Sequence, residues 1–201
     1  MKIAIIGAGF FGATAALKLS KYHDVDLFEK KKDILNGASK INQFRFHLGF
    51  HYPRSKKTLN EIKSSYKLFI NFFSNKVFEK TSNFYGVANK GSKISYNSYL
   101  KILKRFNLKY KVTNQKFNNI SNLLLTNEKV LNYFKFKQII KNKLKNSGVN
   151  LYLNTQLKKN QVNNYDKIII CTYSANNKIL NNLSKIKKSK KNRYELIEKI
   201  V

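Results

Sequence analysis

Three glycines near the N-terminus have the spacing of a dinucleotide-binding turn. Gly7, Gly9 and Gly12 stand in G-A-G-F-F-G, directly after the apolar run Ile3–Ile6. In such a turn the first glycine permits a tight bend, the second lets backbone amides approach a pyrophosphate, and the third lets a helix pack closely on a strand. Glycine-rich turns are common, so the flanking elements have to support the assignment.

Those elements are the expected ones. The run Ile3–Ile6 predicts a buried strand, and the apolar spacing of A-T-A-A-L-K-L-S-K-Y predicts a helix that begins at the turn. A second strand, Val25–Glu29, ends in an acidic residue about 20 residues after the glycines, where a ribose-binding carboxylate is expected. Glu29 would accept hydrogen bonds from ribose hydroxyls and disfavour NADP. The alternatives are a solvated carboxylate beside Lys30, and NAD in place of FAD.

A second segment gathers the residue types that the chain otherwise uses sparingly. Gly37–Ser55, with the sequence G-A-S-K-I-N-Q-F-R-F-H-L-G-F-H-Y-P-R-S, contains two of three histidines, two of four arginines and the only proline. One interpretation is a ligand site that uses the imidazole and guanidinium groups. The other is a polar loop in which His47 and His51 are satisfied by neighbours and Pro53 closes a turn.

Together, these two segments resemble the N-terminal part of the FAD-dependent oxidoreductases of the D-amino-acid oxidase superfamily. The second segment is similar to the T-G-x-N-S-G-V-I-H-x-G-x-Y-Y-x-P-x-S pattern of members that oxidise 2-hydroxy acids such as 2-hydroxyglutarate. The matching positions are Ser39, Asn42, His47, Gly49, Tyr52 and Ser55.

The resemblance implies roles for particular residues. His47 would lie near the reactive edge of the flavin, and Arg45 or Arg54 would hold a substrate carboxylate through a bidentate contact. These three are the expected catalytic residues, and no metal site is expected. The expected cofactor-binding residues are Gly7, Ala8, Gly9, Phe10, Phe11, Gly12, Glu29, Lys30, Ser39, Asn42, His47, Gly49 and Thr172.

The rest of the chain predicts an α/β protein: a Rossmann-type FAD-binding domain with an inserted, incomplete α+β substrate domain. Helices are expected over 56–75, within 98–108 and up to Gly148, with turns at Gly86 and Gly91 and strands over 149–153 and 165–172. The last strand resembles the superfamily's D-x-V-I-x-A-T-G element, with Tyr173 in place of the glycine. The expected FAD-binding segments are 1–79 and 130–184, the substrate segment is 80–129, and 185–201 is a basic tail or the start of a missing half.

Charge and composition do not require a nucleic-acid partner. The net charge is +30, but only four of the 40 basic residues are Arg, and Lys, Asn, Ile, Phe and Tyr share A/T-rich codons. Only Lys185–Arg193 is dense enough to form a basic patch. A single cysteine, Cys171, suits a reducing compartment, and no apolar run reaches the roughly 20 residues of a membrane span, so a cytoplasmic location is expected.

The predicted function is oxidation of a small hydroxy acid, amino acid or amine by hydride transfer to FAD. We expect a small-molecule substrate, no specific nucleic acid, and a truncated chain whose missing C-terminal half a second chain could supply. The alternatives are an NAD-dependent Rossmann protein and a non-catalytic nucleotide-binding fragment with a basic surface.

Overall fold

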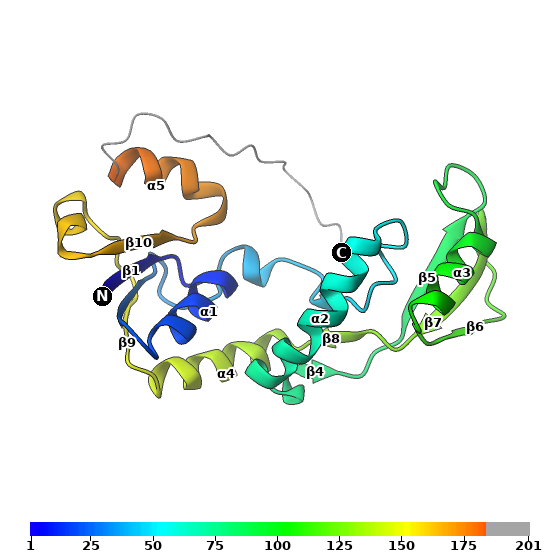
Figure 1. Ribbon diagram of the computed structural model, residues 1–201, viewed down its shortest axis with the longest axis horizontal. Coiled ribbons are helices and arrows are strands. Elements are labelled where there is room, and N and C mark those ends of the chain that lie inside the picture. The colour runs from blue at the N-terminus through cyan, green and yellow to red at the C-terminus, as the bar shows by residue number, and fades with distance from the viewer. Residues whose placement is uncertain (184–201) are drawn as a thin grey trace. The chain divides into compact units, whose positions relative to one another are not determined.

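The computed structural model describes residues 1–183, which form two compact units (Figure 1). Of these residues, the first unit contains 1–42 and 137–183, and the second contains 43–136. The predicted basic patch Lys185–Arg193 and the predicted tail 185–201 lie outside the described residues.

The first unit is built on a parallel sheet with the strand order β10-β1-β2-β9. Ile5 is paired with Leu27 on one side and with Ile169 on the other. A parallel sheet whose strands alternate with helices is the Rossmann-type arrangement that the sequence predicts. Its elements are β1 (Lys2–Ile6), α1 (Phe10–Leu19), β2 (Asp24–Phe28), α4 (Tyr133–Lys145, which begins in the second unit), β9 (Val149–Tyr152), β10 (Lys167–Ile170) and α5 (Asn176–Leu183).

Both faces of this sheet are covered by helices, which is why β1 and β10 read as continuous apolar runs. Ala4 and Ile6 point to the face on which Ile179 and Leu183 of α5 pack. Because side chains alternate along a strand, Ile3 and Ile5 point to the other face. Helix α1 lies on the opposite side of the sheet from α5 (Figure 1). The predicted strand, turn and helix are confirmed.

The second unit contains two small antiparallel sheets, with strand orders β3-β8-β4 and β5-β7-β6. The predicted helices over 56–75 and within 98–108 are confirmed as α2 and α3. The elements are β3 (Arg45–Phe46), α2 (Lys56–Phe73), β4 (Phe78–Glu79), β5 (Asn83–Ala88), α3 (Tyr96–Arg105), β6 (Tyr110–Val112), β7 (Ile120–Thr126) and β8 (Lys129–Leu131).

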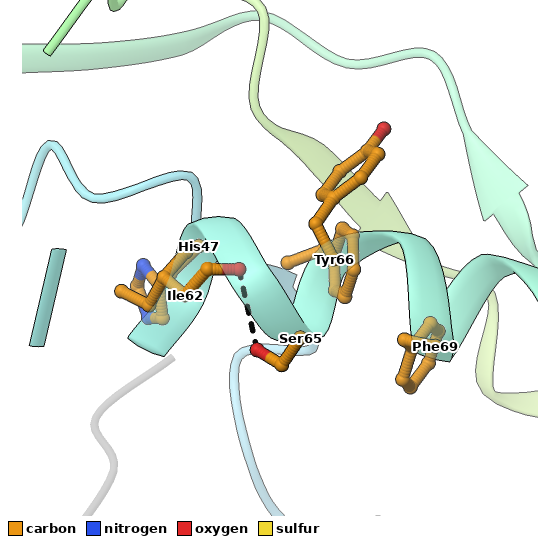
Figure 2. A pocket seen from close by; sticks show the side chains of 6 residues that line it. His47, Ile62, Ser65, Tyr66 and Phe69 are labelled. Carbon is orange, nitrogen blue, oxygen red and sulfur yellow. Dashed lines mark hydrogen bonds between the residues drawn. The ribbon is translucent and has the colours of Figure 1, made fainter. Parts of the chain in front are cut away.

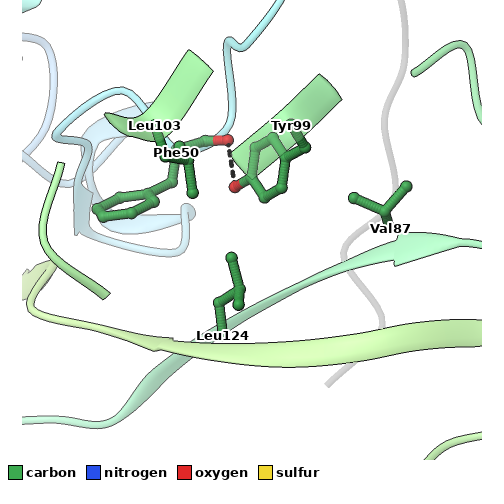
Figure 3. Packing of buried hydrophobic residues seen from close by; sticks show 5 residues of the cluster. All are labelled: Phe50, Val87, Tyr99, Leu103 and Leu124. Atoms are coloured by element: carbon green, nitrogen blue, oxygen red, sulfur yellow. Dashed lines mark hydrogen bonds between the residues drawn. The ribbon is translucent and has the colours of Figure 1, made fainter. Parts of the chain in front are cut away.

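A compact hydrophobic core holds α3 against the sheet β5-β7-β6 (Figure 3). The Tyr99 hydroxyl donates to the backbone carbonyl of Phe50 at 2.9 Å, so the loop before α2 is tied into this core. Burying an aromatic side chain with its hydroxyl satisfied avoids the cost of an unpaired polar group. The buried members are Phe50, Val87, Tyr99, Leu103 and Leu124.

Two details differ from the expectation. Gly86 is not a turn: it lies within β5, where the pairing with β7 shifts between Gly86 and Ala88. A glycine inside a strand often marks such a bulge. The boundaries between the compact units lie at residues 42/43 and 136/137, whereas the sequence predicts domain boundaries at 79/80 and 129/130. Helix α2 therefore belongs to the second unit. The assignment of domain functions stays a prediction.

Candidate functional site

The first glycine of the turn has a conformation that only glycine adopts easily. Gly7 follows β1 with φ of +99°, and its N–H donates to the Phe28 carbonyl at 2.7 Å. A Cβ at this position would lie 2.6 Å from the backbone oxygen of Cys171, at the end of β10. Because Gly7 has no side chain, the chain can bend here while β10 lies directly beside β1.

The other two glycines have different surroundings. A Cβ on Gly12 would lie 1.8 Å from the Gly7 carbonyl oxygen, so this glycine lets α1 pack directly on the turn. A Cβ on Gly9 would approach only the Ser39 hydroxyl, at 3.3 Å. Gly9 is also the N-cap of α1 and supplies no side-chain cap to it. Protein atoms therefore fill the Cβ position at Gly12, whereas at Gly9 only the Ser39 hydroxyl comes within 4 Å of it.

Glu29 is fixed against this turn. Its Oε2 accepts the Ala8 N–H at 2.9 Å and its Oε1 accepts the Lys31 N–H at 3.0 Å. The residue is half-buried, whereas neighbouring Lys30 is exposed. Each carboxylate oxygen has a second lone pair, so Glu29 retains capacity for ligand hydroxyls. This carboxylate is held at the turn by backbone hydrogen bonds and is not a freely solvated strand end.

Three further predicted residues lie around the turn. The Ser39 hydroxyl accepts the Phe10 N–H at 2.9 Å, and the Asn42 amide donates to the Ser39 carbonyl at 3.3 Å. The Thr172 methyl group would be 3.3 Å from a Cβ on Gly7. In contrast, Phe11 is 77% exposed, so its side chain makes little contact within the chain. The folded chain thus gathers Ser39, Asn42 and Thr172 from distant positions in the sequence.

Tyr173, at the position of the superfamily's glycine, has a positive φ of 55°. This left-handed conformation disfavours residues with a Cβ. The side chain is 65% exposed. The backbone therefore keeps the glycine-like bend although the residue is tyrosine.

In the second unit, His47 faces a buried carboxylate. Its Nδ1 lies 3.6 Å from Glu128 Oε2, and Glu128 is only 1% exposed. The same carboxylate accepts the Leu48 N–H at 2.7 Å and the Tyr85 hydroxyl at 2.5 Å. The Arg45 guanidinium lies over the Tyr85 ring, 4.9 Å from its centre. We call Arg45, His47, Tyr85 and Glu128 the Glu128 network.

Burial and hydrogen bonding act in opposite directions on Glu128. Burial favours its neutral form, but His47, the Tyr85 hydroxyl and the Leu48 N–H stabilise the carboxylate, and together they hold the pKa of Glu128 below its ordinary value. Tyr85 responds in the opposite sense: burial and the adjacent Glu128 raise the pKa of its hydroxyl, which remains a donor. The network therefore contains a buried anion with defined donors.

His47 also lines a pocket of about 250 Å³. Figure 2 shows the helix α2 residues that form the pocket with it. The lining is mainly apolar and aromatic, with the Ser65 hydroxyl as a polar exception. The lining residues are Phe46, His47, Ile62, Ser65, Tyr66 and Phe69.

The remaining predicted residues of this segment have structural explanations in the second unit. Gly49 has φ of +120°, and a Cβ there would lie 2.4 Å from a methyl carbon of Leu59. Ser55 is the N-cap of α2 and accepts the Thr58 N–H at 3.2 Å. Tyr52 contacts the His47 ring edge-on, with ring centres 5.7 Å apart, and Arg54 lies in an exposed turn. Their proposed roles toward a cofactor or substrate stay predictions.

Sequence reasoning missed Tyr85 and Glu128. Neither belongs to a recognisable motif, because 38 residues or more separate them from His47 in the sequence. One signal was present: the chain has only ten acidic residues, and Glu128 interrupts the strand-like sequence L-L-L-T-N-E-K-V-L.

Residues 1–183 contain no cluster of three or more metal-ligating His, Cys, Asp or Glu side chains. In the same range no helix is both long and apolar enough to cross a membrane.

Comparison with curated proteins finds three fungal relatives that match part of the chain, among them the following two. An FAD-dependent monooxygenase of Fusarium mangiferae is 34% identical over 102 residues, which are 50% of this chain and 28% of the relative. An FAD-dependent monooxygenase of Aspergillus flavus is 37% identical over 86 residues, which are 42% of this chain and 20% of the relative. The matched part is thus less than a third of each relative's length.

Solved structures share the fold at low sequence identity. L-proline dehydrogenase from P. horikoshii matches 94% of this chain and 56% of its own, with a TM-score of 0.68 and 16% identity. Glycine oxidase from Geobacillus kaustophilus matches 77% of this chain and 47% of its own, with a TM-score of 0.63 and 13% identity. This chain therefore spans about half the length of these proteins.

A family model settles the wider relationship. The model described as "FAD dependent oxidoreductase" matches residues 2–187, which is nearly the whole chain. This match confirms the resemblance drawn from the two N-terminal segments and favours FAD over NAD as the cofactor. The chain therefore belongs to the FAD dependent oxidoreductase (DAO) family.

Proposed function

We propose that this chain carries the FAD-binding turn and part of the substrate pocket of an oxidoreductase for a small hydroxy acid, amino acid or amine. The observation that carries the proposal is the position of Glu29, whose carboxylate accepts the Ala8 N–H inside the glycine turn. The Glu29 carboxylate could accept a hydrogen bond from a ribose hydroxyl. The comparatively open Gly9 and the N-terminus of α1 beside it could bind a pyrophosphate.

The residues of the turn fit this cofactor. The comparatively open side of Gly9 permits close approach of a pyrophosphate, and the first turn of α1 offers backbone N–H groups that an α-helix leaves without an internal acceptor. The Ser39 hydroxyl already accepts one of them, from Phe10, and can itself donate to a phosphate oxygen. Thr172 and Asn42 would border the same site.

Bound FAD would supply the capacity to accept a hydride from the substrate. The chain's own residues would position the substrate and manage its proton. His47 lines the apolar pocket and can hold or accept a proton, and Arg45 or Arg54 would bind a carboxylate. Because an arginine guanidinium forms charge-assisted, bidentate contacts with a carboxylate, we favour an acidic substrate over a neutral one.

A second candidate is monooxygenation, which the names of the two fungal relatives suggest. The two candidates differ in what happens to oxygen. A monooxygenase incorporates one oxygen atom into the product, whereas an oxidase releases hydrogen peroxide. Mass spectrometry of the product formed under ¹⁸O₂ would separate them.

The test of the proposal is FAD binding by the full 201-residue chain, measured by flavin fluorescence and calorimetry. We expect Gly9→Val to weaken FAD at least about 100-fold by blocking the pyrophosphate, with an unchanged circular dichroism spectrum. Gly148→Val is the matched control, because a side chain there meets nothing within 4 Å. We expect Glu29→Gln to weaken FAD about 10-fold, the equivalent of roughly 1.4 kcal/mol. Unchanged FAD affinity in a folded Gly9→Val protein would overturn the proposal.

A further inference from the structure

We propose that Glu128 and Tyr85 are positioning residues that hold a proton on Nδ1 of His47 and so leave Nε2 as the nitrogen that works in the pocket. This inference deepens the proposed function. Its statement about what Nε2 does in the pocket rests on that function. The contacts themselves lie entirely within residues 43–136.

Glu128 carries a carboxyl group in an almost completely buried position. A buried carboxylate is costly unless it is paired and hydrogen-bonded. Leu48 N–H and the Tyr85 hydroxyl each donate to it, at 2.7 and 2.5 Å, so both oxygens have a defined donor. Among the described residues, His47 is the side chain that forms an ion-pair contact with Glu128. The carboxylate therefore remains an anion that acts on the imidazole.

Nδ1 is the nitrogen of His47 that faces Glu128. His47 Nδ1 is buried, lies 3.6 Å from Glu128 Oε2 and has no hydrogen-bond partner within residues 1–183. A bare nitrogen lone pair directed at a carboxylate would be repelled, whereas an N–H is attracted. At 3.6 Å the contact is electrostatic and longer than a normal hydrogen bond. The sign of the interaction nevertheless determines which tautomer is favoured.

The other groups around His47 leave this preference in place. The Arg45 guanidinium lies over the Tyr85 ring. His51 stacks on His47 with ring centres 5.6 Å apart, and Tyr52 meets it edge-on. None of these side chains offers His47 a second carboxylate, so Glu128 is the anion that orients the ring.

His47 also lines the pocket beside α2. The His47 side chain is 31% exposed although Nδ1 is buried, so another part of the ring is open. With a proton held on Nδ1, a neutral imidazole has its lone pair on Nε2 and can accept a proton from a hydroxyl or amine. In that step the substrate O–H or N–H bond breaks and an Nε2–H bond forms. Tyr85 acts one step further away by holding Oε2 in place.

The experiment is ¹⁵N NMR of the histidine side chains in the FAD-free full-length chain at pH 8. Only His23, His47 and His51 are present, so loss of one signal set in His47→Gln assigns the residue. We expect the hydrogen of the neutral His47 ring to be on Nδ1 in the wild-type chain, with Nε2 bare. In Glu128→Gln we expect the population with a bare Nδ1 to increase at least about threefold.

Two matched variants sharpen the result. Glu61→Gln removes a carboxylate that is 64% exposed on α2 and should leave the His47 signals unchanged. Tyr85→Phe keeps the carboxylate but removes its donor, so we expect a change of the same direction and smaller size.

A wild-type His47 with a bare Nδ1 would overturn the inference, and this result needs no variant that folds. The same holds if folded Glu128→Gln has wild-type His47 signals. FAD affinity, measured in parallel, tests the glycine turn alone, so failure of the proposed function and failure of this inference are distinguishable.

Discussion

The glycine turn of the first unit and the Glu128 network of the second are built in different ways. The turn uses residues within a few positions of one another, Gly7 to Gly12, and backbone groups make most of its contacts. The Glu128 network combines side chains from three separate segments, around Arg45, Tyr85 and Glu128. At Gly7 and Gly12 the backbone leaves no room for a Cβ atom, whereas a network of side chains tolerates changes of shape but not loss of charge balance.

The largest effect should come from adding one methyl group to the turn. Gly12→Ala would place a Cβ 1.8 Å from the Gly7 carbonyl oxygen, and a backbone atom cannot move aside without separating α1 from β1. We expect a loss of at least about 3 kcal/mol in the free energy of unfolding, measured by urea denaturation. Gly148→Ala, in open space, is the control. A stable, native-like Gly12→Ala protein would contradict the packing described for the turn.

The network should show a pH-dependent effect instead. Glu128 has a pKa below its ordinary value in the folded state, so its stabilising contribution is present above the ordinary glutamate pKa and is lost as pH falls through the lowered one. We expect Glu128→Gln to cost about 2 kcal/mol at pH 7, and the difference from wild type to shrink in acid. Denaturation series from pH 7 to pH 3 would measure this. Glu61→Gln should show no such trend, and a pH-independent difference for Glu128→Gln would argue against a charged carboxylate.

Gly49 allows a direct comparison with the turn, because its obstacle is a side chain. An added Cβ would meet a Leu59 methyl carbon at 2.4 Å, and the φ of +120° would also be strained. We expect Gly49→Ala to cost about 1–3 kcal/mol, less than Gly12→Ala, since Leu59 can change its conformation. Thermal unfolding would measure the loss. In a Leu59→Ala background the cost of Gly49→Ala should fall, and an undiminished cost would assign all of it to backbone strain.

The smallest effect should be a gain in stability. Tyr173 has a positive φ and a largely exposed side chain, so Tyr173→Gly relieves strain and loses little burial. We expect a net change of roughly 0.5 kcal/mol in favour of folding, because the greater flexibility of glycine in the unfolded chain offsets part of the relief of about 1–2 kcal/mol. Tyr22→Gly, at an exposed tyrosine without a positive φ, should destabilise the chain. Destabilisation by Tyr173→Gly would show that the tyrosine ring contributes more than its strain costs.

The glycine turn could be predicted from the sequence because its determinants are local. The spacing of Gly7, Gly9 and Gly12, the apolar runs around them and the acidic residue after the second strand all depend on short-range geometry, and they indicated the Rossmann-type fold and the family. The prominence of the second segment was also visible, because its residue types are scarce elsewhere in the chain.

Only the tertiary structure decided which partners those residues have. No spacing rule connects His47 with Glu128, 81 positions later, or shows that Leu59 occupies the space beside Gly49. The sequence likewise could not indicate that α2 groups with the second unit. Local patterns specify backbone conformation, whereas the environment of a buried charge depends on segments that meet only when the chain folds.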